Sequence, residues 1–249
     1  MRIYLAGTSA QWKAYFTPED FRGAYLLESF FYCDAYTEKQ VIPNCGDFLL
    51  DSGAYTFMQG KSTVPDFDEY AERYAAFINR NGIEKYFELD VDAVLGYGEV
   101  KRLREKLQRL TGKPCIPVWH HSRGKEEFIR HCQEFPYVAI GGLVGGKSEY
   151  ARKYWQYFPW FIRTAHENGA KIHALGFTSL IGLAKFHFDS VDSTAWTAGN
   201  RFGHVFLFDG KTLRQTDVPP GHRIRSAREC ARHNYGEWVK FQRWADGHL

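Results

Sequence analysis

Short apolar runs alternate along the chain with longer segments in which apolar residues recur every three to four positions. The first pattern is typical of buried strands and the second of amphipathic helices, so the sequence predicts strands and helices in alternation. We expect about eight strands, the last of which also suits one arm of a hairpin around Asp209 and Gly210. The expected strands are residues 3–6, 48–50, 85–89, 115–119, 137–140, 172–175, a segment that opens at Val191, and 204–208.

Glycine and proline mark where the expected helices begin and end. Thr17 precedes Pro18 as an N-cap precedes the first helical residue, and Gly82, Gly112 and Gly169 follow periodic segments as helix stops. The expected helices are residues 67–81, 100–110, 126–135, 150–168, 180–186 and 226–245, with a further helix start at Thr17.

Strand–helix alternation over 249 residues favours a parallel sheet closed into a (β/α)₈ TIM-type barrel. No repeat, linker or low-complexity segment divides the chain, so we expect one α/β domain over residues 1–249. The sequence has no Gly-x-Gly-x-x-Gly motif after the first strand and no Walker motif, which argues against an open nucleotide-binding sheet.

Polar residues follow several of the expected strands, at the end of a barrel where active sites lie. Aspartates that converge on one mouth repel each other, so some of them should have raised pKa values. Such a cluster indicates either a metal site or an acid/base pair, although an aspartate after a strand also caps the next helix. The strand-end residues are Asp51, Asp90, Asp92, His120, His121, Gly141, Gly142 and Asp192.

Charge is unevenly distributed. The formal net charge is +3, and residues 211–249, a basic C-terminal helical segment, hold eight Lys/Arg against four Asp/Glu. A basic face on a near-neutral body suits a phosphate backbone, and a solvated helix with scattered charges gives the same count.

Cysteine usage and hydropathy bear on the compartment. Five cysteines are an odd number without Cys-x-x-Cys spacing, so we expect neither a disulfide framework nor a zinc site. The N-terminal apolar run is too short for a secretory leader, and no run reaches the length of a membrane span. We therefore expect a cytoplasmic protein.

Five motifs, in order between residues 50 and 210, together resemble the tRNA-guanine transglycosylase (queuine tRNA-ribosyltransferase) superfamily. Leu50-Asp-Ser-Gly-Ala-Tyr55 is similar to its Asp-Ser-Gly-Gly-Phe/Tyr signature, and Glu88-Leu-Asp90 to its Leu-Asp-Glu strand end. Ala139-Ile-Gly-Gly-Leu-Val-Gly145 resembles its Gly-Gly-Leu-Ala-Val-Gly loop. Phe188-Asp-Ser-Val-Asp-Ser-Thr194 resembles the tract of its nucleophilic aspartate, and Asn200-Arg-Phe-Gly203 the glycine-containing segment that follows.

Two departures from the family pattern narrow the resemblance. The Cys-x-Cys-x-x-Cys motif of the family's zinc-binding subdomain does not occur, and Cys230 stands alone in that region. The usual Val-Gln-Gly-Gly is replaced by Val118-Trp-His-His121. The chain is most similar to phage-encoded DNA guanine transglycosylases of the DpdA kind, which exchange guanine in DNA for a 7-deazaguanine such as preQ0. This resemblance implies DNA rather than tRNA as partner, a free 7-deazaguanine as co-substrate, and no cofactor or metal.

The resemblance also implies roles for the carboxylates. Asp192 is the expected nucleophile, with Asp189 as its rival because both stand in similar Asp-Ser contexts. Asp51 is the expected general acid/base, and Asp90 is expected to accept the N1–H and exocyclic amine of guanine. Two carboxylates suffice for displacement at an anomeric carbon.

Further residues are expected around the base and the nucleic acid. A packing role is the alternative for Tyr55 and Trp196, and the alternative for Asp90 is to orient His120. Tyr55 could stack on the base, His120 could donate to O6, and Trp196 could fill the gap left by a flipped nucleotide. The expected base-binding residues are Asp90, Tyr55, Ser52, His120, Gly141, Gly142 and Leu143, and the expected nucleic-acid contacts are Arg201, Arg223, Arg225, Arg228, Arg232 and Trp196.

Three alternative functions stay open on the sequence. The first is the same exchange on tRNA. The second is a metal-dependent barrel hydrolase that uses Asp51, Asp90, Asp92 and His120. The third is a nucleic-acid-binding barrel without catalytic activity.

Overall fold

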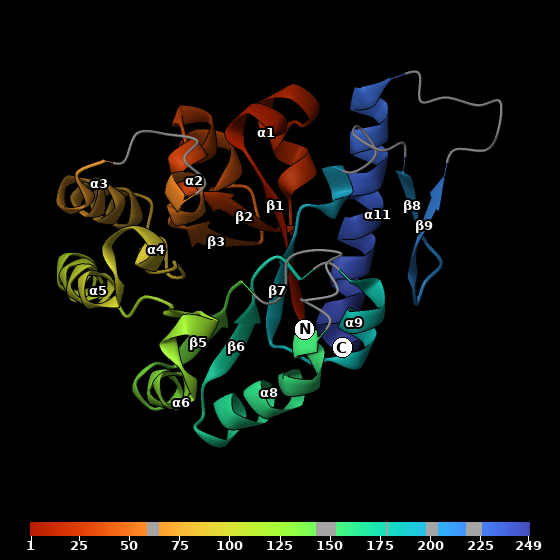
Figure 1. The fold of residues 1–249 in the computed structure, drawn as a ribbon. Coiled ribbons are helices and arrows are strands. Elements are labelled where there is room, and N and C mark those ends of the chain that lie inside the picture. The colour runs from red at the N-terminus through yellow and green to blue at the C-terminus, as the bar shows by residue number, and fades with distance from the viewer. Residues whose placement is uncertain (59–64, 143–152, 178, 198–203, 218–225) are drawn as a thin grey trace.

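The computed structural model describes residues 1–58, 65–142, 153–177, 179–197, 204–217 and 226–249. Seven parallel strands form one curled sheet in the order β3-β2-β1-β7-β6-β5-β4, and helices cover its outer face (Figure 1). The strands are β1 (Arg2–Gly7), β2 (Tyr25–Ser29), β3 (Asp47–Asp51), β4 (Val118–Trp119), β5 (Tyr137–Ile140), β6 (Lys171–Ala174) and β7 (Ser190–Ser193).

The helices before α11 lie between one strand of the large sheet and a later strand, and α11 follows the last strand. They are α1 (Ser9–Tyr15), α2 (Ala54–Met58), α3 (Phe67–Arg80), α4 (Asp92–Leu95), α5 (Tyr97–Thr111), α6 (Lys125–Glu134), α8 (Phe158–Glu167), α9 (Leu180–Lys185) and α11 (Ala227–His248). Short 3₁₀ or π turns are η1 (Pro18–Phe21), η2 (Phe30–Tyr32), η3 (Thr37–Val41), η4 (His121–Arg123), η5 (Trp155–Tyr157) and η6 (Ala195–Thr197). Within the described segments, no helix has both the length and the apolar character needed to cross a membrane.

Tyr86 and Phe87 lie where the expected barrel has a further strand. Tyr86 forms a single parallel bridge with Leu50 of β3, and Phe87 forms one with Ile116, just before β4. The expected α/β alternation and parallel sheet are confirmed, whereas the regular strand expected at 85–89 is reduced to these two bridges.

Two further strands bear on the expected barrel. The sequence predicts no strand at β2 (Tyr25–Ser29), because buried Glu28 interrupts its apolar run. The strand expected at 204–208 forms as β8 (His204–Phe208), and it is the hairpin arm that the sequence also suits: it pairs antiparallel with β9 (Leu213–Asp217), outside the large sheet. The Asp209 side chain closes this hairpin by accepting hydrogen bonds from two backbone N–H groups of the turn.

Apolar side chains fill two layers, one on each face of the sheet. The layer inside the curl consists of Tyr4, Ala6, Leu27, Leu49, Phe87, Ile116, Val118 and Ala139. The larger outer layer packs the sheet against the helices, and in it the Trp12 and Trp196 rings stack with centroids 5.2 Å apart. Because both faces are buried, the strands are short continuous apolar runs, which is why they could be recognised from the sequence.

Helix α11 confirms the helix expected at 226–245 and lies against β1 and the hairpin (Figure 1). Buried Gln242 on α11 bonds to the backbone of both β1 and β2, at Ile3 O and at Tyr25 N and O. The N-terminal amine lies 3.2 Å from Ala245 O near the other end of the chain. The first turn of α11 therefore lies at the carboxyl end of the sheet.

We predict that Gly7→Ala destabilises the fold, because a Cβ at Gly7 would lie 2.2 Å from the buried Trp12 ring. The ring cannot move without disturbing its stack on Trp196, so the free energy of unfolding should fall by about 2 kcal/mol or more, as expected for overpacking. The matched control is Gly236→Ala in α11, where no atom lies within 4 Å, and which should raise stability by about 0.5–1 kcal/mol. Urea unfolding measures both; equal effects of the two variants would contradict the packing described here.

Candidate active site

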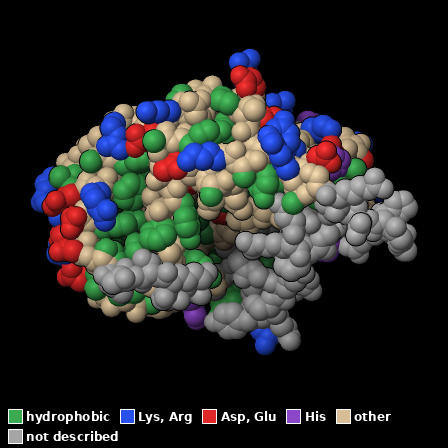
Figure 2. Space-filling model, turned by 90° about the horizontal axis from the view of Figure 1, so that it is seen from above, with side chains coloured by type: hydrophobic (Ala, Val, Ile, Leu, Met, Phe, Trp, Pro, Cys, Tyr) green, Lys and Arg blue, Asp and Glu red, His purple; other side chains and the backbone are tan. Residues whose placement is uncertain are grey.

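Three aspartates that are far apart in the sequence lie at the carboxyl end of the curled sheet. Asp51 is the last residue of β3, Asp192 is in β7, and Asp90 follows the bridged segment at Tyr86 and Phe87. Figure 2 views the molecule from this end and shows a hollow with hydrophobic side chains beside it. The strand-end geometry inferred from the sequence therefore brings these three residues to one end of the sheet.

The turn after β3 fixes the Asp51 carboxylate. Its Oδ2 accepts a hydrogen bond of 3.0 Å from the backbone N–H of Gly53. Gly53 has φ +86°, and a Cβ there would lie within about 3 Å of Phe31, Tyr70 and Ser29. Only glycine fits both the dihedral angle and the space, so the Asp-Ser-Gly sequence has a clear local reason.

Burial is the main reason why the pKa of Asp51 is raised to about 7. The neighbouring carboxylates Asp90 and Asp192 raise this pKa further, while the hydrogen bond from Gly53 lowers it. A carboxyl group with a pKa near neutral pH is suited to give and take a proton. The coupling of Asp51 to both other aspartates also agrees with their common location.

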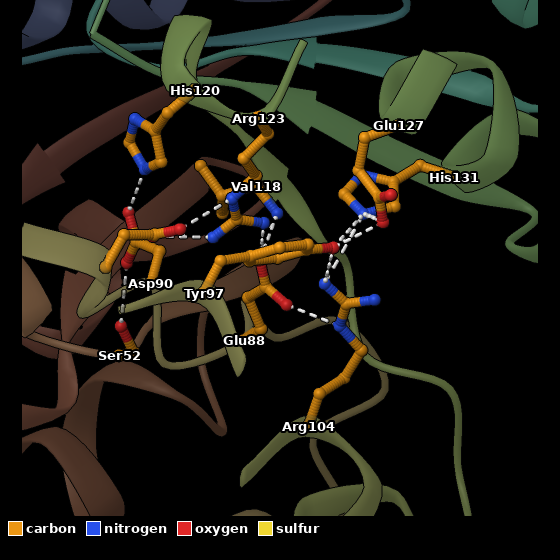
Figure 3. Close-up of polar contacts among 11 residues, drawn as sticks. Ser52, Glu88, Asp90, Tyr97, Arg104, Val118, His120, Arg123, Glu127 and His131 are labelled. Carbon is orange, nitrogen blue, oxygen red and sulfur yellow. Dashed lines mark hydrogen bonds and ion pairs between the residues drawn. The ribbon is translucent and has the colours of Figure 1, made fainter. Parts of the chain in front are cut away.

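Asp90 is buried and has two side-chain partners, shown in Figure 3. His120 Nε2 lies 2.9 Å from Asp90 Oδ2, and the Ser52 hydroxyl donates to Oδ1 over 3.5 Å. Burial raises the pKa of Asp90, and the contact with His120 opposes this shift. The His120 ring packs on Gly141, where a Cβ would lie 2.9 Å from the imidazole.

A buried charged network lies behind this pair and supports it (Figure 3). Glu88 is fully buried and binds Arg104 at 2.5 Å and Arg123 at 2.6 Å. Arg123 also forms two bonds to Asp92 and lies over the Tyr97 ring at 4.4 Å. Because Asp92 is held by this guanidinium, it belongs to the support of the site rather than to a cluster with Asp51 and Asp90.

Asp192 is held through one of its two oxygens. Oδ1 accepts a 2.6 Å bond from the backbone N–H of Gly176 and lies 3.2 Å from Nε2 of buried His173. Within the described parts of the chain, both of these contacts fall on Oδ1. Between described residues, no hydrogen bond or ion pair falls on the other oxygen, Oδ2.

The alternative nucleophile, Asp189, lies at the opposite end of the strand. It precedes β7, accepts from Ile172 N and pairs with His166 on α8. Asp189 also lines a pocket at the amino end of the sheet. The structure thus separates the two candidates, and only Asp192 is near Asp51.

Exposed aromatic side chains lie at the turns that follow β2 and β3. Tyr55, on α2 directly after Gly53, is 64% exposed, which excludes the core role considered as its alternative. Phe31 and Tyr32, in the turn after β2, are also exposed, and a Cβ at Gly53 would touch Phe31. We call Phe31, Tyr32 and Tyr55 the aromatic rim.

The residues that were expected to contact nucleic acid differ in burial and in their partners. The expectation for Trp196 is wrong: the ring is 0% exposed, and its indole N–H donates to Ala6 O at 2.8 Å. The Arg232 guanidinium forms two 2.9 Å bonds to Asp20, while Arg228 is exposed in the first turn of α11. Leu143, Arg201, Arg223 and Arg225 lie outside the described residues.

Some site residues were not recognised from the sequence. His173 contacts Asp192, and Arg123 links Glu88 to Asp92. His173 had a signal, because it is the one polar residue between apolar neighbours in β6 and therefore faces the other side of the sheet from them. Arg123 follows a strand in an irregular turn, where no periodic pattern indicates the direction of a side chain. No group of three or more His, Cys, Asp or Glu able to hold a metal ion occurs in the described parts of the chain.

No family model and no curated protein matches the chain. Among solved structures, it is similar to the carboxyl transferase domain of Rhizobium etli pyruvate carboxylase, with 13% identity and a TM-score of 0.46. The same domain with oxamate and biotin gives 14% identity and a TM-score of 0.47. These matches cover 98% of this chain and 48% of the other, so the chain spans about half the length of those structures.

We predict that Asp51→Asn makes the fold more stable at pH 8 and leaves its stability unchanged near pH 4. A carboxyl group whose pKa is about 7 in the folded chain, against about 4 unfolded, binds more protons when folded over that range. Its contribution to the free energy of unfolding therefore falls as pH rises from 4 to 7, and the variant removes this loss, worth about 2–4 kcal/mol.

Urea unfolding at the two pH values measures this difference. Asp209→Asn is the matched control with the opposite sign, because hydrogen bonds from Thr212 and Lys211 lower the pKa of Asp209 to about 2. That variant should lose stability at pH 8. An Asp51→Asn variant that is less stable than the wild type at pH 8 would contradict the environment described for Asp51.

Proposed function

We propose that the chain exchanges a guanine base in DNA for a free 7-deazaguanine of the preQ0 type, through a covalent glycosyl-aspartate. The observation that carries the proposal is the grouping of Asp51, Asp90 and Asp192 at one end of the sheet, with the pKa of Asp51 near 7. The motif resemblance supplies the reaction class, and the grouping supports it. We also propose that the curled sheet is a (β/α)₈ barrel, with its mouth at the carboxyl end of the strands.

Asp192 has the arrangement of a nucleophile. Its Oδ1 is fixed by Gly176 and His173, so Oδ2 can approach the anomeric carbon C1′ of a flipped nucleotide. When the bond between C1′ and Oδ2 forms, the bond between C1′ and N9 breaks and its electron pair moves to the leaving guanine. The sugar then remains on Asp192 as an ester while the pocket exchanges its base.

Asp51 has the arrangement of the proton-transfer group. With a pKa near 7, it is partly protonated at neutral pH and can give its proton to the leaving guanine. The ionised Asp51 then takes the N9 proton of the incoming base while that nitrogen attacks C1′. The bond between C1′ and Oδ2 breaks, its electron pair returns to Asp192, and the cycle closes without net proton change.

Asp90 and His120 have the arrangement of a base-recognition pair. Among the described residues each Asp90 oxygen has one side-chain partner, and a second lone pair on each oxygen can accept from N1–H and the exocyclic amine of a guanine-type base. The buried Glu88–Arg123 pair fixes the loop that carries His120. The aromatic rim, with Tyr55 most exposed, offers rings on which bases of an unpaired strand can stack.

We predict that Asp192→Asn abolishes exchange of labelled base into DNA, because an amide oxygen is a poor nucleophile at C1′. Wild-type protein that is given DNA without an incoming base should form a denaturation-resistant protein–DNA adduct, detected as a shifted band on a denaturing gel. Asp189→Asn is the matched control: it lies in the same strand region but at the opposite end, and it should keep both exchange and adduct.

Two outcomes would count against the proposal. Exchange by Asp192→Asn at the wild-type rate would remove that residue as nucleophile. Stoichiometric metal in purified, active protein, with loss of activity on chelation, would favour the hydrolase alternative. Competition between tRNA and duplex or single-stranded DNA at one salt concentration decides which nucleic acid is used, since affinities for both depend on salt.

A further inference from the structure

A chain of hydrogen-bonding side chains runs along the inner face of the sheet and ends at Asp192. His173 Nε2 lies 3.2 Å from Asp192 Oδ1, and His173 Nδ1 lies 2.5 Å from Ser190 Oγ. The Ser190 hydroxyl in turn contacts the Tyr137 hydroxyl. The chain thus joins residues of three neighbouring strands, β5, β6 and β7.

Strand register explains why one imidazole can bridge two residues of the next strand. Ser190 and Asp192 are two positions apart on β7, so their side chains lie on the same face. His173 on β6 is the register partner of Ser190, and its ring extends along the strand toward Asp192. Tyr4 and Phe87 pack on the ring with centroids at 6.2 and 5.2 Å, and His173 is fully buried.

The other end of the chain reaches a pocket of about 460 Å³ at the amino end of the sheet. Tyr137 and Ser190 both line this pocket, together with Tyr4 and Lys85. The Tyr4 hydroxyl is not part of the chain, because it donates to Asp47, which also pairs with Lys85. The series of hydrogen-bonded side chains therefore spans the inside of the sheet, from this pocket to the candidate active site.

The chemistry of the partners selects one arrangement of protons. An ionised Asp192 only accepts hydrogen bonds, so His173 must present Nε2–H to it. In a neutral imidazole Nδ1 is then an acceptor and takes the Ser190 hydroxyl proton, and Ser190 Oγ accepts from Tyr137. With a neutral His173, every donor in this hydrogen-bonded series would therefore point toward Asp192.

From this geometry we propose that His173 is a positioning residue for Asp192. Ser190, which contacts Tyr137, fixes the Nε2–H tautomer of His173 through the contact at Nδ1. The role of Asp192 as nucleophile rests on the proposed function, whereas the tautomer does not. Together with Gly176 N–H, His173 holds Oδ1 and turns Oδ2 toward the substrate. The same two N–H groups stabilise the carboxylate charge that returns when the ester bond breaks.

Ser190, His173 and Asp192 form a Ser-His-Asp sequence of contacts, but not a hydrolytic site. The Ser190 side chain is 1% exposed, and its hydroxyl contacts Tyr137 as well as His173. We therefore expect a fluorophosphonate probe to leave the protein unlabelled. Labelling of Ser190 would overturn its place in the chain.

The direct test is ¹⁵N NMR of histidine-labelled protein without substrate, with the His173 signals assigned by their loss in His173→Gln. The wild type should show a protonated Nε2 and an unprotonated Nδ1. Ser190→Ala and Tyr137→Phe each remove a single hydroxyl oxygen and should give mixed tautomers. Tyr4→Phe removes the other hydroxyl next to the ring and should leave the tautomer unchanged.

The kinetic test measures the rate of adduct formation with DNA. Loss of the donor in His173→Ala should lower this rate by about 100-fold, the usual effect of removing one such donor. His173→Gln, whose amide N–H can take the place of Nε2–H, should recover to within about tenfold of the wild type. In Ser190→Ala and Tyr137→Phe the rate of adduct formation should fall about tenfold, as it does when a partner of a contacting group is removed. These two variants also test the proposal if His173→Ala does not fold.

The two proposals fail in different ways. A wild-type His173 that carries its proton on Nδ1, or on both nitrogens, would overturn the positioning role even if base exchange is found. A folded His173→Ala variant within twofold of the wild-type rate would overturn it as well. A protein without exchange activity could still show the expected His173 tautomer and its dependence on Ser190. That result would establish the hydrogen-bonded series and reject the proposed function.

Discussion

Parallel strands that curl toward a common axis bring their last inward-facing residues together, and here those residues include three carboxylates. Their repulsion and their burial act in the same direction on Asp51, whose pKa rises to about 7. Such an arrangement costs stability unless each of the other charges has a partner. Asp90 is paired with His120 and Ser52, and Asp192 with His173 and Gly176. The unfavourable electrostatics therefore act mainly on Asp51, as a raised pKa.

The partners of these carboxylates are themselves held by buried polar groups. Glu88 receives Arg104 and Arg123 from two different elements, and removal of either cation would leave buried negative charge with one fewer partner. Along the inner face of the sheet, Ser190 contacts His173, and Tyr137 contacts Ser190. The carboxylates are therefore fixed from two independent networks, one in the outer layer and one along the inner face.

Much of this fold could be predicted from the sequence, because strands buried on both faces are continuous apolar runs and glycines end several helices. Residues 137–140 and the long C-terminal helix were expected at or close to their true bounds. Strand β2 was not expected, because buried Glu28 breaks its apolar run. Strand 204–208 forms the expected hairpin arm instead of an eighth strand of the large sheet. Local pattern determines the conformation of a segment, whereas long-range packing determines which sheet it joins. For the same reason Asp51, Asp90 and Asp192 could be found at strand ends, while the burial of Trp196 and the partner of Arg232 could not.

The most direct measurement is a crystal structure after soaking with 7-cyano-7-deazaguanine. The account predicts a flat density beside Tyr55, with its amine edge on Asp90, its carbonyl near His120 and its N9 facing Asp51. Density only in the pocket lined by Tyr137 and Lys85 at the amino end, or a carboxyl end that stays empty at saturating ligand, would contradict it.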